Sequence, residues 1–175
     1  MNFYLETQAN LNKDIQKQVD DLIEDPNFPW YFTDTTSKKY KMFSHGLLKR
    51  HITEENYPGE SCSKYFNFFK DIFLNVCNEN NIDVNIIYRG CINKTWYQKE
   101  KYGEIHVDHP FPHKQFIWYL NEFTDAPTYI FDESENLIKT TAVGKNKINI
   151  FSSAKHAQGF CAIGEFRKVI VFTFN

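Results

Sequence analysis

The chain lacks the features that mark membrane, secreted and zinc-ribbon proteins. Its 175 residues contain no window of 18 apolar residues, and no basic segment leads into an apolar one at the N-terminus. Its four cysteines lie 14 or more residues apart without a Cys-x-x-Cys pair, which argues against a structural zinc site or a redox motif. We therefore expect a cytoplasmic protein with buried free thiols and no membrane partner.

The sequence also lacks a concentrated charge of one sign and a segment that reads as a linker. The formal net charge is −2, and the 20 Lys and Arg residues are spread along the chain rather than gathered into a block, so a nucleic-acid partner is not predicted. There is no internal repeat, no linker rich in Gly, Ser or Pro, no Ser-His-Asp or Cys-His arrangement and no glycine loop for phosphates. We expect one domain over residues 1–175, and no pattern indicates its oligomeric state.

Aromatic residues are plentiful instead. The 17 phenylalanines and 10 tyrosines favour strands and a wide interior over a helical bundle. Apolar residues at helical spacing predict amphipathic helices over residues 11–25 and 65–77, with a strand over 40–48 between them and a loop or short strand over 26–36. We describe residues 1–82 as a helical support region.

Residues 83–175 have a different pattern, made of short β-rich runs between turn signals. The expected strands are Val84–Tyr97, Glu104–Asp108, Gln115–Asn121, Thr128–Phe131, Thr140–Val143, Lys147–Phe151, His156–Ala162 and Lys168–Phe174. About eight short strands at this spacing indicate a sandwich or jelly roll. The predicted fold is mainly β, of the α+β kind: a jelly-roll or double-stranded β-helix core, cupin-like, braced by the N-terminal helices.

The residues with the strongest chemical signal are His106 and Asp108, together with His156 and Arg167. In a strand, residues i and i+2 share a face, so His106 and Asp108 can reach one ion and His156 can complete the set. Two histidines and one carboxylate on one face of an octahedron are typical of non-haem Fe(II) oxygenases. Arg167 offers a bidentate fork for a carboxylate. The first pair alone is weak evidence, because this composition produces a His-x-Asp or His-x-Glu pair about once by chance.

Seven stretches of sequence together resemble the 2-oxoglutarate- and Fe(II)-dependent dioxygenases, and above all the small prolyl-4-hydroxylase-like members of phage and bacterial type. They are His106–His109, His113-Lys114, Phe116–Asn121, Thr128–Glu133, Asn149–Ser153, Lys155–Ala157 and Arg167–Phe174. The resemblance covers residues 84–175 and departs from the family at Ala126-Pro127, where relatives often have Gly-Gly.

The resemblance implies a hydroxylase that uses Fe(II), 2-oxoglutarate and O2, with ascorbate as reductant, and that releases succinate and CO2. It implies His106, Asp108 and His156 as catalytic iron ligands, and Arg167 as the partner of the far carboxylate of 2-oxoglutarate. It further implies Tyr97, nine residues before His106, for the co-substrate pocket, where Thr128 is a second candidate. His109 and His113 follow the metal-ligand segment in a Pro-rich loop and are candidates for the substrate side, together with Trp118. The expected partner is an unidentified protein or small-molecule substrate, with a peptidyl proline suggested by the nearest relatives.

Several alternatives stay open. Lys168 competes with Arg167 for the carboxylate, but adjacent strand residues face opposite sides, so only one of them points inward. Trp96 and Tyr102 compete with Tyr97, and His45 and His51 are weaker site residues. Two other kinds of protein would fit the pattern: a cupin-like metal-binding protein with Zn or Mn, and a non-catalytic β-sandwich interaction protein. The first of these has no need of a carboxylate clamp at Arg167.

Overall fold

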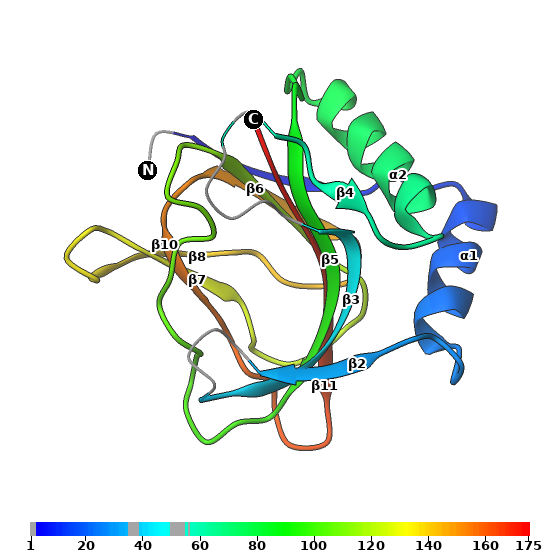
Figure 1. Ribbon diagram of the computed structural model, residues 1–175. Coiled ribbons are helices and arrows are strands. Elements are labelled where there is room, and N and C mark those ends of the chain that lie inside the picture. The colour runs from blue at the N-terminus through cyan, green and yellow to red at the C-terminus, as the bar shows by residue number, and fades with distance from the viewer. Residues whose placement is uncertain (1–2, 35–38, 50–54, 56) are drawn as a thin grey trace.

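The computed structural model describes residues 3–34, 39–49, 55 and 57–175, and two helices and eleven strands lie within them (Figure 1). In chain order they are β1 (Tyr4–Gln8), α1 (Lys13–Glu24), β2 (Tyr31–Asp34), β3 (Lys41–Lys49), β4 (Glu60–Ser61), α2 (Phe66–Glu79), β5 (Ile87–Trp96), β6 (Lys114–Tyr119), β7 (Thr128–Phe131), β8 (Leu137–Thr140), β9 (Lys147–Ser152), β10 (Lys155–Gln158) and β11 (Phe166–Phe174). The predicted fold class, a mainly β jelly roll with N-terminal helices, is confirmed.

The strands form two antiparallel sheets. The major sheet has the order β1-β9-β6-β11-β5-β3-β2, with β4 paired to β3, and the minor sheet has the order β10-β7-β8. The N-terminal half gives the major sheet four strands as well as giving the fold its two helices, and β1 and β4 lie outside every predicted strand. Strand β11 lies between β5 and β6 and is the centre of the major sheet.

The helices pack on the outer face of the major sheet, away from the minor sheet (Figure 1). Asn12 caps the N-terminus of helix α1: its side chain accepts a hydrogen bond from the backbone N–H of Ile15 at 2.9 Å and so satisfies an orphan donor of the first turn. Helix α2 buries Phe73 against Phe116 and Phe172, with ring centroids 5.0 and 4.7 Å apart. The layer between the helices and the major sheet, which combines these rings with aliphatic side chains, is the larger part of the apolar core.

The inner face of the major sheet meets the minor sheet. The residues buried there are Cys91, Ile117, Tyr119, Ile130, Phe151, Val169 and Val171. Along β11 the side chains alternate between the two faces, since Val169 faces inward and Ile170 faces the helices. None of the helices within the described residues is long and apolar enough to cross a membrane.

Three predicted strands differ from the structure. Residues 104–108 form no regular strand, because Asp108 is held by side chains and prolines 110 and 112 interrupt the ladder, and only an isolated bridge joins His106 to His156. The strand predicted at 140–143 overlaps β8 only at Thr140, because β8 is an exposed edge strand at Leu137–Thr140 without a pattern of alternating apolar residues. The strand predicted at 156–162 ends at Gln158, where Gly159 packs against the backbone of residues 126 and 127.

Candidate metal centre and its cavity

Two imidazoles and one carboxylate converge between the sheets. His106, Asp108 and His156 each offer one ligand atom, and these atoms all lie within 4.8 Å of one another. The bridge between His106 and His156 consists of two backbone hydrogen bonds of 3.0 and 2.9 Å, so the two ligand-bearing segments lie side by side. The distance from His156 Nε2 to Asp108 Oδ2 is 3.8 Å. Two ligands of one ion at about 2.1 Å are separated by at most about 4.2 Å, so this pair fits a single transition metal.

Backbone carbonyls select the tautomer of both histidines. His106 Nδ1 lies 2.9 Å from the carbonyl oxygen of Glu104, and His156 Nδ1 lies 2.9 Å from that of Ala154. A carbonyl only accepts, so each Nδ1 is the protonated nitrogen and each Nε2 keeps its lone pair. This outer hydrogen bond is the one that metal-binding histidines use to fix their orientation. The donor set therefore fits a divalent metal held through the two Nε2 atoms and Asp108.

His156 is uncharged at neutral pH. Burial lowers its pKa to about 4, and the neighbouring His106 acts in the same direction, while Asp108 opposes them. An imidazole binds a metal only in its neutral form. His156 therefore presents its lone pair without a proton having to leave at neutral pH.

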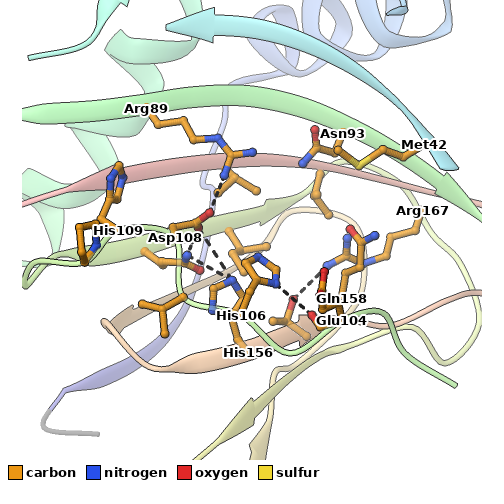
Figure 2. Close-up of a pocket in the computed structure, with 17 residues that line it drawn as sticks. Met42, Arg89, Asn93, Glu104, His106, Asp108, His109, His156, Gln158 and Arg167 are labelled. Atoms are coloured by element: carbon orange, nitrogen blue, oxygen red, sulfur yellow. Dashed lines mark hydrogen bonds and ion pairs between the residues drawn. The ribbon is translucent and has the colours of Figure 1, made fainter. Parts of the chain in front are cut away.

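Asp108 is the most constrained of the three. Its side chain is 5% exposed and forms an ion pair with Arg89, whose Nη1 lies 2.7 Å from Oδ1 (Figure 2). Gln115 Nε2 donates to the other oxygen, Oδ2, and also lies 3.3 Å from His156 Nε2. Both oxygens of the carboxylate are thus oriented by donors from the major sheet.

The three side chains open onto a cavity of about 710 Å³ between the sheets (Figure 2). Its lining is Met42, Arg89, Asn93, Glu104, His106, Val107, Asp108, His109, Pro110, Gln115, Ile117, Thr128, His156, Gln158, Arg167, Val169 and Val171. The volume of the cavity is within the range of small-molecule sites, and its lining combines aliphatic side chains with many polar and charged ones.

Arg167 is a buried cation in this cavity. It is 2% exposed, and it donates from Nε to the carbonyl of Ala126 at 3.0 Å and from Nη2 to Thr128 Oγ1 at 2.9 Å. No carboxylate in the described part of the chain forms an ion pair with it. Because a buried charge is costly without a counter-ion, the site favours an anionic ligand.

Lys168 faces the other way, as strand alternation predicts. Its Nζ lies 2.5 Å from Glu24 Oε1 and 3.4 Å from the carbonyl of Ile23, both at the end of α1. Of the two cations that the sequence offers for a carboxylate, only Arg167 reaches the cavity. The structure thus distinguishes Arg167, which faces the cavity, from Lys168, which the sequence left as an alternative.

A polar cluster lies beneath Arg167. Tyr119 is fully buried, and its hydroxyl lies 2.7 Å from Thr141 Oγ1 and 3.3 Å from Thr128 Oγ1. The guanidinium carbon of Arg167 lies 5.2 Å from the centre of the Tyr119 ring, a cation–π distance. Thr128, expected in the co-substrate pocket, thus lies beside Arg167 and links it to Tyr119.

Other predicted site residues lie elsewhere. Tyr97 is 45% exposed beyond the end of β5 and does not line the cavity. Trp118 is 1% exposed and packs on Phe69 of α2, so it belongs to the helix-facing core and not to the substrate side, because it alternates with the inward-facing Tyr119. Of the residues that competed with Tyr97, Tyr102 packs against Tyr129 and does not line this cavity.

The weaker histidines divide in the same way. His109 lines the cavity, and its Nε2 lies 2.8 Å from Thr173 Oγ1. His113 is buried with its pKa lowered by desolvation, and it binds the carbonyl of Phe111 rather than lining the cavity. His45 is held by Pro29 and Ser63 on the helix side, and His51 lies outside the described residues.

Three site residues were missed from the sequence: Arg89, Gln115 and Tyr119. Gln115, Ile117 and Tyr119 are spaced by two along β6, which is the pattern of the inner face. This spacing could have identified Gln115 and Tyr119 as inward-facing from the sequence. Arg89 gives no such signal, because its partner Asp108 comes from a segment without regular structure.

No protein-family model and no curated protein sequence matches the chain. Solved structures do match. A 2OG-Fe(II) oxygenase family oxidoreductase from Burkholderia pseudomallei has a TM-score of 0.73 at 10% identity, with 98% of this chain and 84% of that chain covered. A prolyl-4-hydroxylase from Pseudomonas putida has a TM-score of 0.59 at 11% identity and coverage of 98% and 91%.

A third match is a prolyl hydroxylase from Trichoplax adhaerens, in complex with a peptide fragment of the hypoxia inducible factor oxygen degradation domain. It has a TM-score of 0.60 at 12% identity, and the match covers 99% of this chain and 84% of that one. Identities this low are evidence about the fold alone. The resemblance to these oxygenases that was predicted from the sequence is thus confirmed for the fold: the chain has the fold of the 2OG-Fe(II) oxygenases and prolyl hydroxylases. The likeness to members of phage type stays a prediction.

Proposed function

We propose that this chain is an Fe(II)- and 2-oxoglutarate-dependent dioxygenase that hydroxylates a carbon of its substrate. One observation supports this above the others. A His-Asp-His set with the donors of a divalent-metal site lines the same cavity as a buried arginine that has no carboxylate partner among the described residues. The first fits a divalent iron, and the second fits an acid that is held by its far end.

His106, Asp108 and His156 would hold Fe(II) through one face, which leaves three positions for a two-point chelating acid and O2. When bound, iron and 2-oxoglutarate would supply O2 activation, in which the keto acid becomes succinate and CO2 and one oxygen atom enters a C–H bond of the substrate. The protein's own share is geometry. Its two Nδ1–H donors orient the imidazoles, and the aliphatic walls at Ile117, Val169 and Val171 exclude water.

Arg167 would bind the carboxylate of 2-oxoglutarate that is remote from the metal, and Thr128 would orient the guanidinium for it. A planar, buried guanidinium matches a planar carboxylate, and the ligand would supply the negative charge that Arg167 lacks within the described residues. This assignment also separates the proposal from a Zn or Mn cupin, which has no use for such a clamp.

The substrate side would be the part of the cavity near the chain segment of Glu104 and Val107. We propose a peptidyl proline or a small molecule as substrate, with the peptidyl proline tested first because two structural neighbours are named prolyl hydroxylases. Among the described residues, no Phe, Tyr or Trp side chain lines this cavity to stack a nucleobase. Ascorbate belongs in the assay as reductant.

The test is an anaerobic titration of the protein with Fe(II) and then with 2-oxoglutarate. Chelation of the keto acid by protein-bound iron is expected to produce a weak visible charge-transfer band, and Asp108→Ala is expected to abolish it. A folded, iron-loaded protein that shows no band would refute the proposal in favour of another kind of metal protein. A protein that binds neither iron nor 2-oxoglutarate would favour a non-catalytic interaction module.

A further inference from the structure

The segment that contains Asp108 is held by side chains from the opposite sheet. Residues 104–109 have no ladder of their own beyond the His106–His156 bridge. Facing them, Arg89 on β5, Thr173 on β11 and Gln115 on β6 occupy the same level of the major sheet, because Thr173 pairs with Arg89 on one side and with Gln115 on the other. We call these three residues the polar row.

Each member of the polar row contacts the metal-ligand segment. Arg89 Nη1 donates to Asp108 Oδ1 at 2.7 Å, Gln115 Nε2 donates to Asp108 Oδ2, and Thr173 Oγ1 lies 2.8 Å from His109 Nε2. Gln115 and Thr173 are almost wholly buried. Three neighbouring strands thus fix two consecutive residues of a segment that has little backbone pairing.

We propose that Arg89 and Gln115 are positioning residues that make Asp108 a single-oxygen metal ligand, an inference that rests on the metal site of the proposed function. Arg89 engages Oδ1, which leaves Oδ2 as the oxygen that faces His156 Nε2 at 3.8 Å. With Oδ1 held by a cation, the carboxylate does not chelate through both oxygens, so it occupies one coordination position.

Gln115 sets the rotation of the same carboxylate. Its amide nitrogen contacts Asp108 Oδ2 and lies 3.3 Å from His156 Nε2, between the two ligand atoms. An amide N–H₂ has two donors, one for each of these acceptors, so the metal-free pair is kept oriented without direct contact between them. Outer partners of this kind change metal affinity by about 10- to 100-fold when they are lost.

The test measures the affinity of the intact protein for Mn(II) alone, by calorimetry in the absence of 2-oxoglutarate. We expect Arg89→Met and Gln115→Leu each to weaken Mn(II) binding by about 10- to 100-fold, and Arg89→Lys to restore part of the loss, because an ammonium can still donate to Oδ1. Lys168→Met is the matched control: it removes a buried cation with an acidic partner from the outer face of the same sheet. Its affinity for Mn(II) should equal that of the wild type.

A second measurement distinguishes a role in positioning Asp108 from a general contribution to the stability of the protein. With Co(II) in place of Mn(II), the visible absorption of Arg89→Met should show a change in coordination number, whereas Lys168→Met should keep the wild-type spectrum. Wild-type affinity and spectrum in Arg89→Met would overturn the inference, as would equal losses in Lys168→Met. If Arg89→Met does not fold, Arg89→Lys and Gln115→Leu decide the matter by the same criteria. Wild-type protein that binds no divalent metal would instead refute the proposed function.

Discussion

Replacing Arg167 with methionine should separate the affinity for 2-oxoglutarate from the stability of the protein. The guanidinium is buried with two hydrogen bonds and no carboxylate partner in the described residues. Methionine removes an uncompensated buried charge, so we expect the free protein to lose little stability. Binding of 2-oxoglutarate, however, loses the cation proposed to hold its far carboxylate, and we expect metal binding at His106 and Asp108 to stay intact.

The size of the effect follows from the burial. Truncating one partner of a buried charged pair costs about 2–4 kcal/mol, which is about 30- to 900-fold in Kd. At 2-oxoglutarate equal to 100 times the wild-type Kd, the wild type gains about 2.7 kcal/mol of stability, or about 5–10 °C in Tm for a chain of this length. A variant with 100-fold weaker binding gains about 0.4 kcal/mol, or about 1 °C.

The assay is thermal unfolding of the Mn(II)-loaded protein with and without 2-oxoglutarate, which avoids turnover. Lys168→Met is the control, since Lys168 follows Arg167 in β11 but contacts Glu24 on the helix side. Its Tm without ligand should fall, and its shift on adding 2-oxoglutarate should match that of the wild type. An unchanged shift in Arg167→Met, or a lost shift in Lys168→Met, would refute the assignment of the carboxylate site.

Three further substitutions probe the parts of the structure around the cavity. Trp118→Ala should lower the free energy of unfolding in urea by about 3–5 kcal/mol, because it empties the layer against Phe69; a value under 1 kcal/mol would contradict its place in the core. Gly159→Ala should cost about 1–3 kcal/mol in the same assay, since a Cβ there would lie 2.5 Å from the carbonyl of Pro127, and wild-type stability would mean that this loop moves freely. Tyr97→Phe should leave the Kd for 2-oxoglutarate unchanged in calorimetry, because Tyr97 is exposed outside the cavity; a tenfold weaker Kd would reinstate its predicted role.

The fold was predictable because apolar periodicity reports burial. The runs around β6, β9 and β11 are apolar on both faces, as expected of strands covered by helices on one side and a second sheet on the other. The alternation of Arg167 and Lys168 also followed from strand geometry alone. Strand β1 was missed because it is a partly exposed edge with no buried stripe.

The site was only partly predictable, because some of its contacts join segments without a local pattern. His106 and Asp108 were chosen as neighbours on a strand, yet they converge within an irregular segment held from across the cavity. Tyr97 was chosen by its distance along the chain from His106, and that distance does not define on which side of the sheet a residue lies. Arg89 can be identified as a site residue only from the three-dimensional contact between β5 and Asp108.

Strand β11 ties the identity of the cation in the cavity to the register of the sheet. Because side chains alternate, a slip of one residue would exchange Arg167 for Lys168 and replace a planar fork by a point charge. Pairing with β5 and β6 on both sides prevents such a slip. A misregistered molecule would therefore be compact and rich in strands but would lack the guanidinium to which the proposed function assigns the carboxylate of 2-oxoglutarate. The response to that ligand would then be a stricter criterion of correct folding than secondary-structure content.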